Sequence, residues 1–280
     1  MYNAARKRIF EAYKHTAEIY DKCVSERFGD AKFGIESLTR LLLRDMDLKD
    51  NTKILDLASG TGLSTFQLVD WIDGKGQFYG VDFSPHMIKR AEKNAEKINY
   101  KINFQVGDVE SLKYPDNFFD AVISNMSFQM FPDKLKALKE IYRILKPGGR
   151  TGLLYGANEH LKELVTLCKD YLVTHPELSE FSKAVSDVSW MHINLEDTQR
   201  LFWEAGLRHP LIYGYHRIMY VNPKTFWETN PYPALWEPHI PVKMREEIST
   251  EIINVMKDRS IKRGFKINWY TIQAYGSKPT

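Results

Sequence analysis

The chain has 280 residues, of which 43% are hydrophobic, and 39 lysines and arginines against 36 acids leave a formal charge of only +3. This balance argues against a nucleic-acid partner, because affinity for DNA or RNA depends on clustered cations. The two cysteines, Cys23 and Cys168, give neither a disulfide framework nor a metal-binding spacing, and no metal is expected. No secretory signal and no apolar run of about eighteen residues is present, so we expect a cytoplasmic protein without an integral membrane segment.

The first fifty residues are expected to form a helical cap. Residues 3–24 carry apolar and aromatic side chains at mostly helical spacing, which predicts an amphipathic helix. A loop is expected over residues 29–34 and a second helix over residues 35–46.

Residues 53–64 are typical of a strand followed by a tight loop and a helix start. Ile54, Leu55 and Leu57 suit a strand that is buried on both faces. Gly60 and Gly62 allow the backbone to turn sharply and to approach a ligand closely. We expect Ser64 or Thr65 to cap the next helix. The N-terminus of that helix carries a partial positive charge and would face a ligand bound above the loop.

Four further predicted strands follow in order, and three of them end at a polar residue or a Gly-Asp pair. Strand 77–81 ends at Asp82, where a carboxylate can accept hydrogen bonds from two ribose hydroxyls. Strand 102–106 ends at Gly107-Asp108, and strand 121–124 ends at Asn125. After a helix over 133–145, we interpret Lys146-Pro147-Gly148-Gly149 as a turn leading to a fifth strand over 151–155.

This series of motifs, over residues 51–155, resembles the class I S-adenosylmethionine (SAM)-dependent methyltransferases, the group that includes the ubiquinone and menaquinone C-methyltransferases. The resemblance implies an α/β fold: a Rossmann-like, seven-stranded mixed sheet with helices on both faces. It also implies an N-terminal helical lid over residues 1–50, a SAM-binding core over 51–155, and a C-terminal part, 156–280, that completes the core. A nicotinamide dinucleotide fold is the rival, but it requires a third glycine where this chain has Thr65.

The resemblance also implies which residues contact SAM. The loop after the first strand would hold the methionine part, Asp82 the ribose, and Asp108 the adenine amine. Ala58 departs from the family pattern, which has glycine at that position. The predicted cofactor residues are Tyr20, Asp56, Ala58, Gly60, Thr61, Gly62, Asp82, Phe83, Met87, Asp108, Val109 and Asn125.

The C-terminal part contains two insertions that we expect to cover the substrate, over residues 156–192 and 222–265. The first is helical and is interrupted at His175-Pro176. A core helix over 195–205, between Asn194 and Gly206, and a strand over 211–221 separate them. Prolines and aromatic residues over 222–241 predict irregular structure, followed by a helix over 242–259 and a last strand over 267–275.

The chemistry of methyl transfer requires alignment more than acid or base catalysis, because the sulfonium supplies the leaving group. Where the acceptor must lose a proton, His192 and His216 are the candidate bases. The aromatic excess of the C-terminal half favours a small or medium, apolar or aromatic acceptor. The candidate substrate residues are Trp190, Tyr215, Trp227, Tyr232 and Trp236.

Two alternatives remain open from the sequence. One is a non-catalytic SAM-binding regulatory protein, suggested by Ala58 and by the absence of an obvious base. The other is a methyltransferase acting on RNA or protein. The acceptor atom and the oligomeric state are not determined by the sequence.

Overall fold

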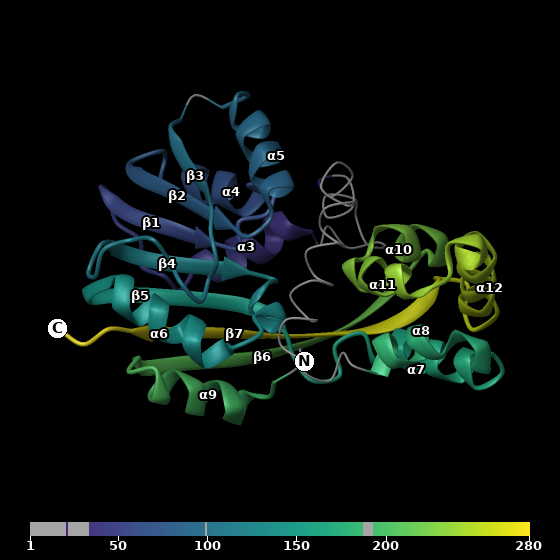
Figure 1. Ribbon diagram of the computed structural model, residues 1–280. Coiled ribbons are helices and arrows are strands. Elements are labelled where there is room, and N and C mark those ends of the chain that lie inside the picture. Colours follow the sequence, from purple (N-terminus) through teal and green to yellow (C-terminus); the bar gives the residue numbers. More distant parts are fainter. Residues whose placement is uncertain (1–20, 22–33, 99, 187–192) are drawn as a thin grey trace.

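The computed structural model describes residues 21, 34–98, 100–186 and 193–280 (Figure 1). Within this part of the chain, seven strands form one sheet in the order β3-β2-β1-β4-β5-β7-β6. Their bounds are Thr52–Leu57 (β1), Gly76–Asp82 (β2), Ile102–Val106 (β3), Phe119–Asn125 (β4), Leu145–Gly156 (β5), Arg208–Val221 (β6) and Phe265–Ser277 (β7).

The pairing of the strands places five carboxyl ends at one edge of the sheet. β1 pairs in parallel with β2 and β4, β2 with β3, and β4 with β5. β7 is antiparallel to both β5 and β6. The predicted α/β fold with a mixed, seven-stranded sheet is therefore confirmed.

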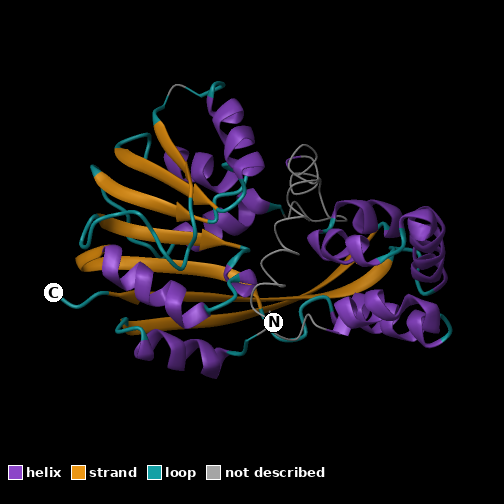
Figure 2. Ribbon diagram, in the orientation of Figure 1, coloured by secondary structure: helices purple, strands orange, loops and turns teal. Residues whose placement is uncertain are grey.

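Helices cover both faces of the sheet (Figure 2). Ile54 and Leu55 of β1 are fully buried and belong to opposite hydrophobic clusters, as the two-residue period of a strand requires. The cluster of Ile54 includes side chains of α3 (Ile35–Leu43) and α4 (Leu63–Trp71), and the cluster of Leu55 includes side chains of α6 (Lys134–Ile144) and α9 (Leu195–Glu204). Helix α5 (Pro85–Ala95) contacts β2 and β3.

The two predicted insertions pack together into one helical unit beyond the end of the sheet. The first contributes α7 (Lys162–Val173) and α8 (Ser179–Ser186), and the second α10 (Pro223–Thr229), α11 (Pro231–Trp236) and α12 (Arg245–Asp258). Helix α12 contacts α7, and α11 contacts α8. The ends of β6 and β7 extend from the sheet as a ribbon that carries α10–α12 (Figure 1).

The prediction of irregular structure over 222–241 is wrong, because two Asn-Pro pairs start helices there. The Asn222 side chain accepts a hydrogen bond from the Thr225 N–H, and the Asn230 side chain accepts one from the Tyr232 N–H. Each asparagine is an N-cap, and the proline after it stands at the first helical position, where its missing N–H costs nothing.

Two smaller expectations also differ from the structure. Residues Lys146–Gly149 lie within β5, where the pairing with β4 shifts register, and do not precede it as a separate turn. Helix α4 begins directly after Gly62, which adopts a left-handed φ of 87°, so neither Ser64 nor Thr65 caps it. Their side chains bond elsewhere: Ser64 Oγ with Thr39, and Thr65 Oγ1 with Asp56.

Candidate functional site

The loop between β1 and α4 is built from residues with left-handed backbone. Ala58, Gly60 and Gly62 have φ values of 60°, 55° and 87°. A side chain at Gly62 would bring its Cβ to 2.8 Å from the Phe66 ring, so glycine is required there for space as well as for conformation. Ala58 adopts a strained backbone, since the left-handed region costs an L-residue about 1–2 kcal/mol.

Asp82, at the end of β2, holds this loop in place. Its Oδ2 accepts a hydrogen bond from the Gly60 N–H at 2.9 Å, and its Oδ1 accepts one from the Ser84 N–H at 2.9 Å. The residue is 5% exposed, and burial raises the pKa of its carboxyl to about 6. Each carboxylate oxygen can accept a further hydrogen bond, so the group can bind a ligand hydroxyl while it anchors the loop.

The end of β3 contributes Asp108 and Val109 in a tight turn. Asp108 Oδ1 accepts a hydrogen bond from the Glu110 N–H at 3.0 Å, and the Asp108 side chain is half-buried. Val109 is buried and provides an apolar surface beside the carboxylate.

Asn125, at the end of β4, has a buried amide that is only half satisfied. Its Nδ2 donates to Thr39 Oγ1 at 2.9 Å and to Ser64 Oγ at 3.2 Å. Its Oδ1 accepts no hydrogen bond from the residues that the structure describes. A buried acceptor without a donor costs about 1–3 kcal/mol.

These strand ends surround one cavity of about 570 Å³. Eight of the twelve predicted cofactor residues line it, namely Ala58, Gly60, Asp82, Phe83, Met87, Asp108, Val109 and Asn125. The residues that sequence reasoning missed are Val106, Gly107, Ser111, Lys113, Met126, Ser127, Met130, Phe131 and Pro132. Four of these, Val106, Gly107, Met126 and Ser127, lie at or just after a predicted strand end, which was the available signal. The wall formed by residues 130–132 gave no signal, because its apolar residues resemble any core segment before a helix.

Three predicted cofactor residues lie behind or beside the cavity. Asp56 is 1% exposed, and its Oδ2 accepts a hydrogen bond from Thr65 Oγ1 at 2.7 Å. Thr61 is buried, and its carbonyl accepts a hydrogen bond from Asn94 Nδ2 at 3.2 Å. Gly62 forms the N-cap of α4. Tyr20 lies outside the described residues.

The buried Asp56 predicts how stability depends on pH. Its pKa is raised to about 7, first by burial and also by the nearby Asp82 carboxylate. The folded state therefore holds a proton that the unfolded state releases near pH 4, so the free energy of unfolding falls as the pH rises from about 4 to about 7. Asp56→Asn should flatten this fall, as measured by urea unfolding without ligand at pH 5 and pH 8.

A matched control tests whether the effect belongs to this carboxyl. Asp70→Asn removes an exposed acid on the neighbouring helix α4 and should leave the pH dependence unchanged. Equal slopes for wild type and Asp56→Asn would contradict the assignment.

The predicted substrate and base residues that the structure describes do not line this cavity. Trp227, Tyr232 and Trp236 are at most 6% exposed and form part of the core of the helical unit. His216 lies exposed on β6, where its Nε2 is 2.7 Å from Asn268 Oδ1. The neighbouring Tyr215 shares a hydrogen bond with Arg44. Trp190 and His192 lie outside the described residues, and the roles predicted for all seven remain predictions.

The described part of the chain contains no group of His, Cys, Asp and Glu side chains that could hold a metal ion. Among the same residues, no helix is both long and apolar enough to cross a bilayer.

A family model described as a methyltransferase domain matches residues 48–205. The chain is 32% identical over 176 residues to a demethylmenaquinone methyltransferase of Staphylococcus aureus, covering 59% of this chain and 71% of that protein.

Solved structures share the fold at low sequence identity. The YcgJ protein of Bacillus subtilis superposes with a TM-score of 0.60 at 20% identity, covering 87% of this chain and 99% of that one. A phosphoethanolamine N-methyltransferase of Haemonchus contortus superposes with a TM-score of 0.62 at 17% identity, covering 97% and 60%. The family model spans more than half of the chain and includes the four strand ends described above. The chain therefore belongs to the methyltransferase domain family and is a class I SAM-dependent methyltransferase.

Proposed function

We propose that the cavity above β1, β2 and β3 is the SAM site and that the enzyme methylates a small or medium, apolar or aromatic molecule. The observation that carries the first part is the convergence of eight predicted residues, from four strand ends, around a single cavity. A cavity of about 570 Å³ is within the usual size range of small-molecule sites.

The residues present fit the parts of SAM. The Asp82 carboxylate suits a ribose diol, since it offers two oxygens and no donor. Asp108 would accept a hydrogen bond from the adenine amine. Phe83, Met87 and Val109 would pack against the faces of the adenine ring. Asn125 lines the cavity together with Ala58 and Gly60, beside which we place the methionine part of SAM.

When bound, SAM supplies an electrophilic methyl group on a sulfonium. The chain itself then has to align the acceptor and exclude water, which can lower a barrier by about 7–11 kcal/mol. Met126, Met130 and Phe131 give the cavity an apolar wall suited to excluding water. Whether a base such as His192 or His216 takes a proton depends on the acceptor atom.

Two observations support a small-molecule acceptor. The Staphylococcus aureus relative is named for methylation of demethylmenaquinone, an aromatic small molecule. The formal charge of +3 on 280 residues does not provide the cationic surface that an RNA substrate requires.

A labelling experiment separates the three candidate functions. Purified enzyme and SAM carrying an isotopically labelled methyl group are incubated with extract that has been separated into small-molecule, protein and RNA fractions, with demethylmenaquinone as one defined acceptor. We expect label in the small-molecule fraction. Label confined to protein or RNA would identify a macromolecular acceptor, and binding of SAM without any transfer would favour a regulatory role.

A further inference from the structure

The segment between β3 and β4 is a long connection without a helix. Residues 107–118 contain turns, a bend and one isolated bridge between Asp108 and Ser111, yet they run from the edge strand β3 to the central strand β4. Parallel strands are usually joined through a helix, which fixes such a crossover. This segment also supplies Gly107, Asp108, Val109, Ser111 and Lys113 to the cavity. Its position must therefore be fixed from outside.

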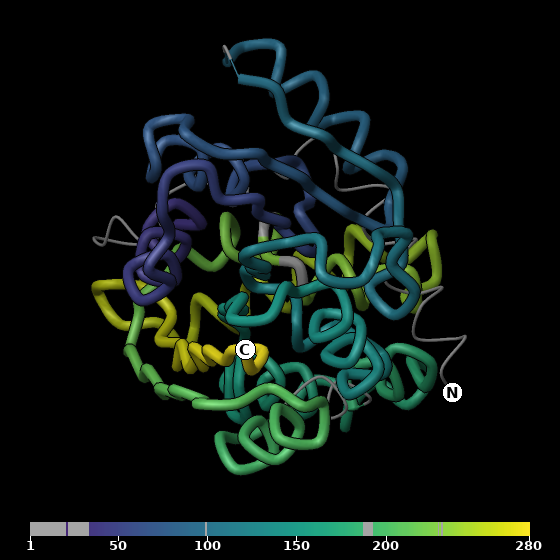
Figure 3. The backbone as a smooth tube through the Cα atoms, turned by 90° about the vertical axis from the view of Figure 1, so that its left-hand side faces the viewer, coloured from purple at the N-terminus to yellow at the C-terminus, as the bar shows by residue number. Residues whose placement is uncertain are grey.

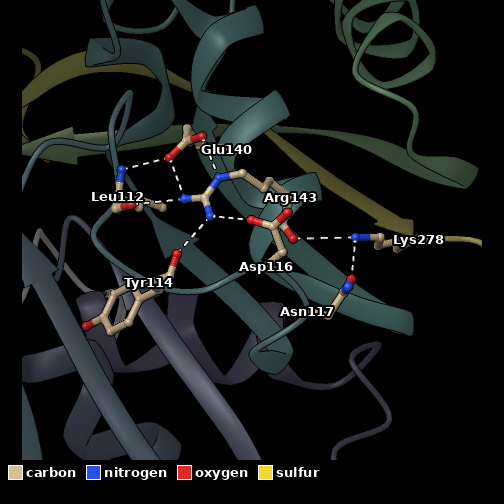
Figure 4. Close-up of polar contacts among 7 residues, drawn as sticks. All are labelled: Leu112, Tyr114, Asp116, Asn117, Glu140, Arg143 and Lys278. Atoms are coloured by element: carbon tan, nitrogen blue, oxygen red, sulfur yellow. Dashed lines mark hydrogen bonds and ion pairs between the residues drawn. The ribbon is translucent and has the colours of Figure 1, made fainter.

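Helix α6 provides that support through Arg143 (Figure 4). The guanidinium donates to the Leu112 carbonyl at 2.9 Å, to the Tyr114 carbonyl at 2.8 Å and to Asp116 Oδ1 at 2.8 Å. One side chain thus holds three positions of the segment, and two of its contacts are with the backbone.

Glu140, one turn earlier on α6, completes the contact. Its Oε2 accepts a hydrogen bond from the Leu112 N–H at 2.7 Å, so both backbone groups of Leu112 bond to α6. Glu140 and Arg143 are joined by two parallel hydrogen bonds of 2.9 Å, and the pKa of Glu140 is lowered chiefly by this pairing. The two side chains are 19% and 30% exposed, so water screens the pair only in part.

The start of α6 is tied to the same segment at a second point. Glu110 Oε1 accepts a hydrogen bond from the N–H of Asp133, the N-cap of α6. Asp133 directly follows Pro132, which also lines the cavity. Helix α6 therefore fixes the distance between the wall that carries Asp108 and the wall formed by residues 130–132.

From these contacts we infer that Arg143 is a positioning residue that sets the affinity for SAM through the 107–118 segment, without touching the cofactor. This inference rests on the proposed cofactor site. When the segment is not held, part of the binding free energy must be spent on ordering it, and affinity falls accordingly. A lysine at position 143 cannot replace this arginine, because only the planar guanidinium group can donate to two carbonyls and a carboxylate at once.

The test compares Arg143→Ala with a matched control, Arg200→Ala. Arg200 on α9 also pairs with two carboxylates, Asp197 and Glu204, each at 3.1 Å, but it contacts no residue of the cavity. In calorimetry with S-adenosylhomocysteine at 25 °C, we expect Arg143→Ala to raise the Kd about tenfold. The Kd of Arg143→Lys should lie between those of wild type and Arg143→Ala. The Kd of Arg200→Ala should stay within about twofold of the wild-type value. The KM for SAM should rise while kcat at saturating SAM changes little.

Hydrogen exchange supplies a readout that does not depend on the ligand. The Leu112 amide, which donates to Glu140, should exchange faster in unliganded Arg143→Ala, and the amides of β1 should not. A lowered melting temperature with unchanged Kd and unchanged Leu112 exchange would overturn the inference. Failure of the wild type to bind S-adenosylhomocysteine would overturn the proposed cofactor site instead.

Discussion

Asp82→Ala is expected to raise the Kd for S-adenosylhomocysteine by about 100-fold or more. The substitution removes the acceptor proposed for the ribose, and a hydrogen bond to a charged group contributes about 1.5–3 kcal/mol. It also leaves the N–H groups of Gly60 and Ser84 without the acceptor that fixes the loop after β1. Isothermal titration calorimetry measures the effect, with circular dichroism to verify that the variant is folded.

Two further variants make the result specific. Asp82→Asn keeps an oxygen acceptor but loses the charge, and it should fall between wild type and Asp82→Ala. Asp170→Ala removes an exposed carboxylate of α7 that pairs with Arg259, so its Kd should match that of the wild type. An Asp82→Ala protein that binds as tightly as the control would refute the role given to this carboxylate.

Trp236→Ala is expected to lower the free energy of unfolding by about 3–5 kcal/mol, the range for deletion of a large buried aromatic side chain. Trp236 is 1% exposed and packs against Tyr232, with ring centroids 6.0 Å apart, and near Phe181. The loss arises because α8 and α11 share this side chain as part of their common core. Urea unfolding followed by circular dichroism measures it.

The control is the exposed tryptophan of α9. Trp203 is 49% exposed and lies against the Arg208 guanidinium, so Trp203→Ala should cost less than about 1 kcal/mol. Trp236 was also predicted as a substrate residue. Unchanged stability combined with a raised KM for the acceptor would support that role and contradict the packing role.

The convergence of Asp82 and Asp108 on one cavity was predictable because it depends on chain order alone. Once residues 53–57, 77–81 and 102–106 are recognised as parallel strands, their ends must lie at one edge of the sheet. Asp82 and Asp108 are then near each other without any knowledge of packing. The missed wall at residues 130–132 comes from a turn after β4, and its position depends on how α6 packs.

The helical unit shows what sequence patterns could not predict. Residues 162–186 and 223–258 are separated by α9 and β6, and their apolar stripes do not reveal that they pack against each other. Prolines and aromatic residues over 222–241 indicated irregular structure, whereas Asn222 and Asn230, each directly before a proline, start helices there. The contacts of Arg143 with Leu112 and Tyr114 join residues about thirty positions apart, a distance at which no periodicity gives a signal.

The most direct test of the central claim is a crystal structure of this protein with S-adenosylhomocysteine. The account predicts ligand density in the cavity, with the ribose hydroxyls within hydrogen-bonding distance of the Asp82 carboxylate and the adenine beside Asp108 and Val109. Density for the bound ligand at another place, with this cavity empty, would contradict it.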